Sequence, residues 1–322
     1  MMKRFRNILV SLDTRHDDQS ILESAAEVAR SDQAKLTLVD VVPPMAWMTR
    51  LLVPDHEHIQ QLMTEEKQQQ LDVLAGSLRD DGLEVETKVL LGKTSTEIIR
   101  EVLRNRHDLV MRVAKGSDSR RKGTFGTTGS RLLRECPCTV QLVTSAHSKP
   151  THVLACVDTA TNNEDDAKLN EEILDLARTI AGRNNARLSI VHAWTIDSEQ
   201  LLDGRMPRGE FEQMKRSREE HVEKLLNQFL DPHGCSTQDD HVYMLKGDAV
   251  HVIPNFAKTE GVDLVVMGTI GRSGAAGLLI GNTAEEILDS IECSVAAVKP
   301  TNFVSPIKTG DYVAAPKESV NS

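Results

Sequence analysis

Apolar residues in the first half of the chain fall into short runs that alternate with longer segments of helical spacing. The runs at 7–12, 35–42, 85–91, 108–113 and 139–143 are typical of buried strands. The segments at 21–29, 57–78, 94–104 and 128–134 carry apolar residues at helical spacing and predict helices. Because strands that alternate with helices form crossover units, the pattern predicts a mostly parallel sheet with helices on both faces.

The second half of the chain repeats this pattern. Late in each half the matching residues lie 155 positions apart, as in Asp108-Leu109-Val110 and Asp263-Leu264-Val265, or Gly126 and Gly281. Runs at 152–157, 187–193, 241–245, 264–267 and 294–298 predict five more strands. We therefore expect two tandem α/β domains at residues 1–146 and 151–300. Each is expected to be doubly wound and Rossmann-like, with a five-stranded sheet.

Two segments lie outside the repeat. Residues 147–150 form a short polar linker, so the two domains are expected to lie close together. The tail at 301–322 contains Pro306, Gly310 and Pro316 and has no clear periodicity. We expect this tail to be extended or disordered.

The composition disfavours several classes of protein. No apolar run approaches the roughly 18 residues that cross a bilayer. The apolar run behind the basic first residues is too short for a signal peptide, so we expect a cytoplasmic protein. A net charge of −10 with 3% aromatic residues argues against a nucleic-acid binder, which needs a basic surface and often stacking rings.

The five cysteines favour packing over chemistry. Their number is odd and they include no pair of C-x-x-C motifs, so neither a disulfide framework nor a structural zinc site is indicated. Cys136-Pro137-Cys138 could form a redox or metal pair, but it lies where a helix gives way to a strand, and Cys138 matches Cys293 in the repeat. We interpret these thiols as small buried apolar groups.

A glycine-rich loop follows the fourth predicted strand of the second half. It begins at Gly268-Thr269 and ends at Gly281-Asn282-Thr283, where a helix is predicted to start. Glycine lets the backbone approach a phosphate, and a helix N-terminus offers unpaired N–H groups at the edge of the sheet where ligands bind. The loop therefore predicts an anion site. Two simpler interpretations stay open, namely a tight turn and a capping box between Thr283 and Glu286.

Other phosphate-binding motifs are missing. Gly92-Lys93-Thr94 resembles the end of a P-loop, but Thr87 stands where the first glycine belongs. The first predicted strand of each half is not followed by a G-x-G-x-x-G turn. A P-loop enzyme and an ordinary NAD-binding domain are therefore disfavoured.

The arrangement Gly268-x2-Gly271-x9-Gly281, followed by a small polar residue, resembles the ATP-binding motif of the universal stress protein family. The resemblance covers almost the whole chain, including an Asp after the first strand of each half (Asp13, Asp158). It points to the tandem, two-domain members of the family. It implies the adenine nucleotide alpha hydrolase-like variant of the fold and ATP as the ligand, with or without Mg²⁺.

The resemblance also implies which residues bind the nucleotide. Asp158 would lie by the adenine and ribose, Ala193 would line the base pocket, and the loop would hold the ribose and phosphates. Asn282 stands where the family usually has Ser or Thr, and its amide can still donate a hydrogen bond. Asp158 has an alternative role as a turn or helix-capping carboxylate. The implied set is Asp158, Ala193, Gly268, Thr269, Gly271, Arg272, Gly281, Asn282 and Thr283.

The first half departs from the motif. Val113 stands where Gly268 stands in the second half, and a β-branched side chain there should obstruct a close backbone approach. The basic residues 120–122 are interpreted as a solvated loop, with binding of another anion as the alternative. The run 55–58 contains two acidic residues and two histidines, and we interpret it as a helix N-terminus because a third metal ligand is missing.

These features favour a stress-response module that binds ATP in its second domain and acts through protein partners. No general base, nucleophile–histidine pair or metal cluster accompanies the loop, which argues against an efficient enzyme. Two alternatives stay open. One is a slow ATPase or other adenylate enzyme, since one fold hosts many reactions. The other is a scaffold that holds an apolar ligand beneath residues 45–52 and the long helix of the first domain.

The resemblance carries an expectation about assembly as well. The fifth strand of each half, at 139–143 and 294–298, corresponds to the edge through which single-domain family members dimerise. An exposed apolar edge strand is a liability unless it is covered. We expect the two domains to form an internal pseudo-dimer, and we leave a homodimer of the chain open.

The contrast between Gly268 and Val113 predicts one nucleotide per chain. Titration calorimetry with ATP should give a stoichiometry near one, with binding in the second domain. Val113→Gly alone should not create a second site, because Arg112, Lys115 and residues 120–122 also differ from their counterparts. A stoichiometry near two would contradict the assignment.

Overall fold

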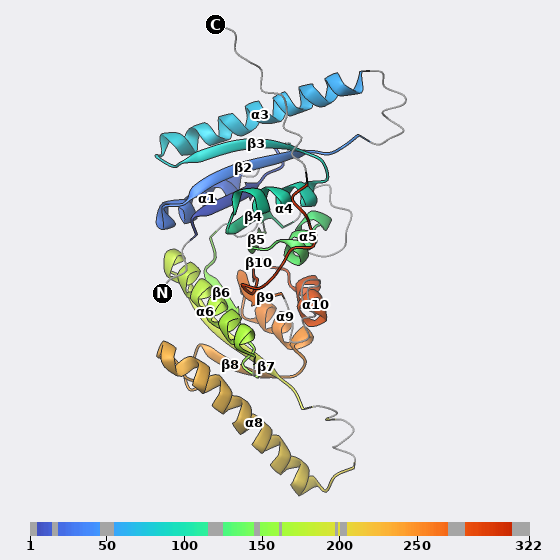
Figure 1. Cartoon of the computed structure of the whole chain (residues 1–322). Coiled ribbons are helices and arrows are strands. Elements are labelled where there is room, and N and C mark those ends of the chain that lie inside the picture. The colour runs from blue at the N-terminus through green and yellow to red at the C-terminus, as the bar shows by residue number, and fades with distance from the viewer. Residues whose placement is uncertain are drawn as a thin grey trace. The chain divides into compact units, whose positions relative to one another are not determined.

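The computed structural model describes residues 5–14, 19–45, 55–114, 125–144, 149–160, 163–196, 199, 205–269 and 281–310 (Figure 1). The chain divides into two compact units, one built mainly from residues 4–149 and the other from residues 150–302. Each unit is an α/β domain with a five-stranded parallel sheet, as the sequence predicts.

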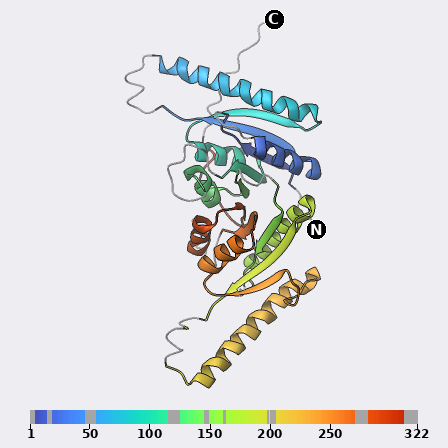
Figure 2. The same cartoon turned by 180° about the vertical axis from the view of Figure 1, so that it is seen from behind.

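The first domain has the strand order β3-β2-β1-β4-β5, and every neighbouring pair is parallel. α1 packs on β1, β2 and β4, while α4 contacts α5. Views from opposite sides show these helices on the two faces of the sheet (Figures 1 and 2). Its elements are β1 (Asn7–Ser11), α1 (Gln19–Asp32), β2 (Lys35–Val42), α3 (His56–Asp80), β3 (Val85–Leu91), α4 (Thr94–Asn105), β4 (Leu109–Val113), α5 (Thr127–Glu135) and β5 (Thr139–Val143).

The second domain has the same topology, with the strand order β8-β7-β6-β9-β10 and parallel pairs throughout. α6 packs on β6, β7 and β9, and α9 contacts α10. Its elements are β6 (His152–Cys156), α6 (Glu164–Asn184), β7 (Arg187–Trp194), α8 (Arg208–Leu230), the 3₁₀ turn η1 (Asp231–His233), β8 (Val242–Lys246), α9 (Ala249–Thr259), β9 (Leu264–Gly268), α10 (Asn282–Ser290) and β10 (Ser294–Val298).

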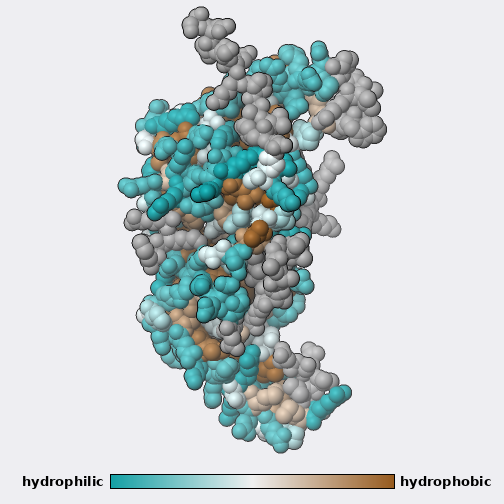
Figure 3. Space-filling model, in the orientation of Figure 1, coloured by the Kyte–Doolittle hydropathy of each residue, from teal (hydrophilic) through white to brown (hydrophobic). Residues whose placement is uncertain are grey.

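The central strands are apolar on both faces because helices cover both faces of each sheet. All five residues of β10 are buried, and Leu264–Met267 in β9 are buried as well. Large apolar side chains are rarely exposed in the described ranges; they are Ile59, Leu62, Met63 and Val73 on α3 and Val304 in the tail. One face of the molecule accordingly shows mostly hydrophilic residues (Figure 3). Where the structure describes the chain, no helix is long and apolar enough to cross a membrane.

The first helix of each domain ends on a left-handed residue. Gln33 follows α1 with φ 55° and Asn185 follows α6 with φ 51°, which places the two residues at matching positions of the repeat. Counting back from them, Ile21 of α1 corresponds to Ile173 of α6. The described part of α1 is 14 residues long and α6 is 21 residues long, so the two helices differ at their N-terminal ends.

From Phe303 on, the C-terminal tail belongs with the first domain. Residues 301–310 contain neither helix nor strand, which fits the extended form expected for them. Arg100 and Arg104 of α4 donate hydrogen bonds to the carbonyl oxygens of Lys308 and Thr309, at 3.3 and 2.8 Å. Ser305 Oγ donates to the Glu135 carbonyl oxygen at 2.7 Å. Hydrogen bonds to α4 and to the end of α5 therefore hold this segment of the tail.

The five cysteines are free thiols. Cys136 Sγ lies 3.6 Å from Cys138 Sγ, too far for a disulfide. The hydrogen bond to Cys136 and burial raise the pKa of the Cys138 thiol well above its usual value. Burial also raises the pKa of Cys156, and it raises the pKa of Cys293 to about 12. Thiols with raised pKa values are poor nucleophiles and metal ligands, which agrees with a packing role.

Replacing Cys136 and Cys138 together by alanine should lower the free energy of unfolding by roughly 1–3 kcal/mol, because two sulfur atoms leave the packed interior. ATP binding should not change. Denaturant titration and ATP calorimetry on the same protein measure the two effects. Loss of ATP binding at unchanged stability would show that these thiols act chemically.

Candidate functional site

The two ends of the glycine loop meet in the second domain. Gly268 closes β9 and Thr269 follows it, while Gly281 directly precedes α10. The Gly281 amide donates a hydrogen bond to the Thr269 carbonyl oxygen at 2.9 Å, which joins the two ends. Gly271 and Arg272 lie outside the described residues.

The loop opens into the N-terminus of α10. Gly281 is the N-cap residue, with extended backbone angles (φ −63°, ψ 142°). Glycine has no side chain to accept a hydrogen bond from the first-turn amides. Asn282 and Thr283 are exposed in that first turn. The arrangement suits an anion, because unpaired N–H groups and the positive end of the helix dipole coincide there.

The capping-box interpretation of the loop fails on the position of the helix. A capping box needs Ser or Thr at the N-cap and Glu or Gln three residues later. Thr283 is the second residue of α10, and the N-cap is Gly281. Thr283 and Glu286 therefore do not form that motif.

A buried lysine supports the start of the loop. Lys299, the residue after β10, is 5% exposed, and its Nζ donates a hydrogen bond to Thr269 Oγ1 at 2.5 Å. Thr269 is fully buried. The pair holds a positive charge next to the residue that follows Gly268. Lys299 was not predicted as a site residue, although its charge directly after the apolar run of β10 could have indicated one.

Asp158 and Ala193 lie at the same edge of the sheet as Gly268. β6 pairs with both β7 and β9, in the register Cys156↔Val191 and Cys156↔Met267. Asp158 and Ala193 each follow the matched residues by two positions, and Gly268 by one. Parallel strands end at one edge of the sheet, and neighbouring strands lie about 5 Å apart. Ala193 and Gly268 therefore lie on the two strands that flank β6, and Asp158 follows β6 between them.

The Asp158 side chain is exposed and takes part in a turn. Its Oδ1 accepts a hydrogen bond from the Ala160 amide at 3.3 Å, the local bond typical of an Asp in a turn. Its backbone is held on both sides by Asn170 of α6, whose Oδ1 accepts from the Asp158 amide and whose Nδ2 donates to the Asp158 carbonyl oxygen. The turn interpretation of Asp158 agrees with this contact.

Beside Ala193, a buried histidine supports the turn. His192 is 1% exposed, and its Nδ1 lies 3.1 Å from the Val157 carbonyl oxygen and 3.4 Å from the Thr159 amide. By strand register His192 matches Asp40 of the first domain, and Thr159 matches Thr14. Sequence reasoning did not single out His192, because one histidine in an apolar strand carries no motif.

Gly268 is also closely packed inside the protein. A Cβ atom at this position would lie 2.8 Å from Leu169 Cδ2 and 3.5 Å from Ile173 Cδ1, both on α6. The sequence predicts a close phosphate approach or a tight turn at this glycine, and the structure adds a contact with α6. The first domain tolerates Val113 at the matching place, and the position that corresponds to Leu169 there is Asp17, outside the described residues.

The matching edge of the first domain is occupied by charged side chains. Asp40 is 3% exposed and its Oδ2 lies 2.5 Å from Lys67 Nζ of α3. The same Oδ2 accepts hydrogen bonds from the Thr14 amide and hydroxyl. The cavity that Asp40, Lys67, Asp13 and Arg112 help to line has a volume of ≈ 120 Å³. Pockets for small molecules usually measure about 300–1,000 Å³, so this one is small for a nucleotide.

A larger groove lies elsewhere in the first domain, between α1 and α3. Its volume is ≈ 1190 Å³. Apolar lining comes from Leu22 and Ala26 of α1 and from Val73 and Leu74 of α3, with charged residues among them. The groove lies against α3, the long helix beneath which an apolar ligand was a possible interpretation of the sequence. Residues 46–54, which were part of that interpretation, lie outside the described ranges.

Comparison with known proteins decides the family. The model of the universal stress protein family matches the chain twice, over residues 4–144 and 150–299. The chain belongs to the universal stress protein family. The resemblance drawn from the glycine loop and the repeat is thus confirmed.

Two-domain relatives match this universal stress protein over nearly its whole length. It is 27% identical to universal stress protein E of Salmonella typhi, over 96% of this chain and 99% of the relative. Identity to the homolog from Haemophilus influenzae is 24%, over 92% and 98%. A functionally unknown protein from Pseudomonas aeruginosa PAO1 has a similar structure, with a TM-score of 0.72, 25% identity, and 92% and 93% coverage.

Gly268→Val should destabilise the second domain by roughly 1–3 kcal/mol, because the new side chain meets Leu169. Leu169→Ala should recover part of that loss in the double variant, so the two changes should be clearly non-additive in denaturant titrations. Additive losses would show that the contact with α6 does not constrain position 268.

The double variant also separates packing from ligand binding. If a stable Gly268→Val/Leu169→Ala protein binds ATP, the glycine is not needed to admit the phosphates.

Proposed function

We propose that this universal stress protein binds ATP, with or without Mg²⁺, at the glycine loop of its second domain, and that it acts in the cytoplasm as a stress-response sensor through protein partners. The observation that carries the proposal is the junction of the two loop ends together with the hydrogen bond from Lys299 to Thr269, at whose positions the first domain has Thr144 and Ala114. Thr269 and Gly281 are joined by a backbone hydrogen bond, and the chain then enters α10 through a glycine N-cap.

The electrostatics of the loop favour a phosphate chain. Amides of the first turn of α10 point their dipoles at the space in front of the helix, where an anion gains most. Lys299 Nζ donates a hydrogen bond to Thr269 Oγ1 and fixes the start of the loop. Asp158, which follows β6, and Ala193 of β7 lie at the same edge of the sheet, and we assign them to the ribose and the base. Gly271 and Arg272 complete the proposed set together with Asn282 and Thr283.

The first domain has different residues at the positions of the Thr269–Lys299 pair. Ala114 and Thr144 occupy the positions of Thr269 and Lys299, so the buried ammonium pair has no equivalent there. Asp40 and Lys67 fill the region next to the position of the base. Both differences support one nucleotide per chain.

Two other functions fit parts of the molecule, and one experiment separates all three. An enzyme of adenylate chemistry would show multiple turnover of ATP that is lost when Gly281 is changed. A scaffold for an apolar ligand would use the groove between α1 and α3, whose volume is ≈ 1190 Å³. Native mass spectrometry of the purified chain reads the bound species directly, and ATP or ADP at one copy supports our proposal.

The internal pseudo-dimer remains a proposal of its own. Within its own domain β5 ends the strand order, and so does β10. Both strands are apolar, so a partner strand would protect them from aggregation. Cross-linking through a single cysteine introduced at the start of each strand tests whether these edges pair. Native mass spectrometry decides whether the chain also forms a homodimer.

Thr269→Ala combined with Lys299→Thr gives the second domain the residues that the first domain carries at these positions. We expect the Kd for ATP to rise at least about tenfold, because a charge-assisted hydrogen bond that fixes the loop is lost. Folding should persist, since the first domain folds with alanine and threonine there. Calorimetry with ATP measures the Kd.

Lys258→Met is the matched control, because Lys258 is an exposed lysine on α9 of the same domain. It removes one positive charge and should leave the Kd within about twofold, since exposed charges act weakly. An equal loss of affinity in both proteins would mean that net charge, and not the buried pair, sets ATP binding.

A further inference from the structure

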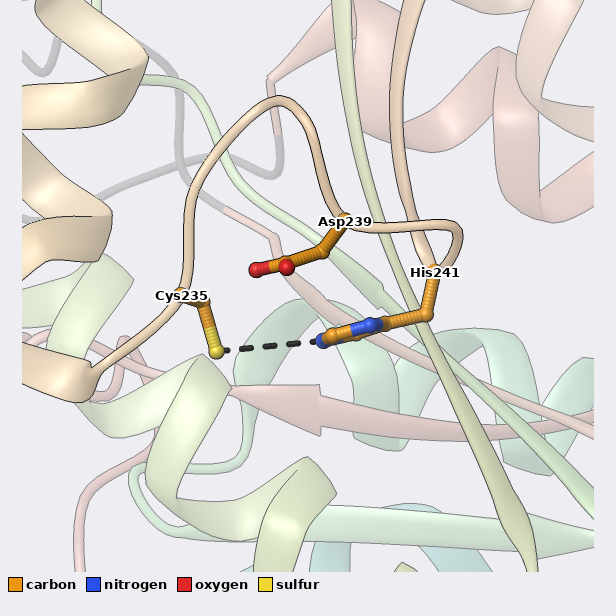
Figure 4. Close-up of side chains that lie close together, drawn as sticks. All are labelled: Cys235, Asp239 and His241. Carbon is orange, nitrogen blue, oxygen red and sulfur yellow. Dashed lines mark hydrogen bonds between the residues drawn. The ribbon is translucent and has the colours of Figure 1, made fainter.

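The loop between η1 and β8 gathers three side chains of different chemistry. Cys235, Asp239 and His241 each offer one ligand atom, and these atoms lie within 4.8 Å of one another. Figure 4 shows the thiol, the carboxylate and the imidazole facing a common space. All three side chains are half-buried. The group lies apart from the glycine loop in the sequence and has no role in the proposed ATP site.

The spacing of the atoms suits a tetrahedral metal ion. Cys235 Sγ lies 3.8 Å from His241 Nε2. Zinc bonds of about 2.3 Å to sulfur and about 2.0 Å to nitrogen, at a tetrahedral angle, place the two ligand atoms roughly 3.5 Å apart. The two side chains therefore need to move by only a few tenths of an ångström to share one ion.

The loop holds its ligands in place without an ion. The Ser236 amide donates to Asp239 Oδ2 at 2.7 Å, and the Asp239 amide donates to the Ser236 carbonyl oxygen at 3.1 Å. Thr237 is tied to α8, because its amide donates to Asn227 Oδ1 at 2.8 Å. The carbonyl oxygen of His241 accepts from the Ile190 amide of β7. A preformed loop loses less conformational entropy when it binds a ligand.

Arg178 of α6 adds a positive charge at the thiol. Its Nη2 lies 3.1 Å from Cys235 Sγ and 3.1 Å from the His233 carbonyl oxygen. Metals bind cysteine as the thiolate, whose sulfur can accept a hydrogen bond from an N–H group at this distance. A thiolate and a carboxylate together carry two negative charges, and the Arg178 guanidinium carries one positive charge. The site with its ligands in these forms would keep a net negative charge, which attracts a dication. Outer partners of this kind are common around metal ligands.

Cysteine, histidine and aspartate also form catalytic triads, but the geometry here differs. In a triad the carboxylate accepts from the histidine and the histidine faces the thiol, so the three groups form a chain. Asp239 instead accepts from the Ser236 amide, and its oxygen lies near both other ligand atoms. The three groups converge on one point.

We propose that Cys235, Asp239 and His241 bind one zinc ion, with water at a fourth position. A mixed sulfur, nitrogen and oxygen set suits zinc, and excludes Mg²⁺ and Ca²⁺, which require oxygen ligands. The ion would fasten the end of α8 to the edge strand β8. Sequence analysis predicted no metal, because the spacing C-x3-D-x-H matches no common zinc motif.

Zinc titration of the chelator-treated full chain, in competition with a coloured chelator, tests the site. Cys235→Ser and His241→Gln should each weaken binding by at least about 100-fold, since even loss of an outer partner costs about 10–100-fold. Asp240→Asn is the matched control, because it removes an exposed neighbouring carboxylate outside the group. It should leave the affinity within about twofold. Circular dichroism confirms that each variant is folded.

Two measurements on the unchanged protein keep the test independent of the variants. Cobalt in place of zinc should give a thiolate-to-metal charge-transfer band, and zinc should slow the alkylation of Cys235, as mapped by peptide mass spectrometry. The proposal is overturned if Cys235→Ser binds zinc as the native chain does, if cobalt shows no thiolate band, or if zinc leaves the alkylation of Cys235 unchanged.

Discussion

The parallel pairing of β6 with β9 is the constraint on which the site of the second domain depends. At this pair the strand order reverses, with β7 and β8 on one side and β10 on the other. The chain leaves β6 toward α6 and leaves β9 toward α10, and a crevice opens where such connections part. The register Cys156↔Met267 then fixes Asp158 beside Gly268. A slip of one residue would turn every side chain of the strand to the other face.

The two domains share this framework and differ in the residues that line the edge. The loops close alike, since Gly126 donates to the Ala114 carbonyl oxygen at 3.0 Å as Gly281 does to Thr269. α5 and α10 also start alike, each with a glycine N-cap. The differences concern side chains that fill space or carry charge. The described backbone at both ends of the loop is therefore alike in the two domains, whereas the side chains there differ.

The sequence predicted the fold well because both the pattern and its repetition were strong. The strands at 35–42, 85–91, 139–143 and 294–298 have the predicted bounds. The fully buried β10 reads as a nearly continuous apolar run, whereas β3 is mostly half-buried and carries polar residues among its apolar ones. The long helix α8 was not predicted, because its apolar residues are few and spaced over 23 positions. The position of the loop between Gly268 and the start of α10 was predicted from the glycine spacing. Lys299, His192 and the contact between Gly268 and Leu169 did not, because each depends on residues brought together from distant parts of the chain.

The buried lysines explain why the two edges are not interchangeable. Each domain buries one ammonium group at the carboxyl ends of its strands, Lys67 against Asp40 in the first and Lys299 against Thr269 in the second. Removing one member of a buried ion pair leaves a desolvated charge, so Lys67 and Asp40 hold each other in place. In the first domain the ammonium is neutralised by its own carboxylate, so a phosphate gains little there. A glycine at position 113 would open space without supplying positive charge, and space alone does not bind an anion.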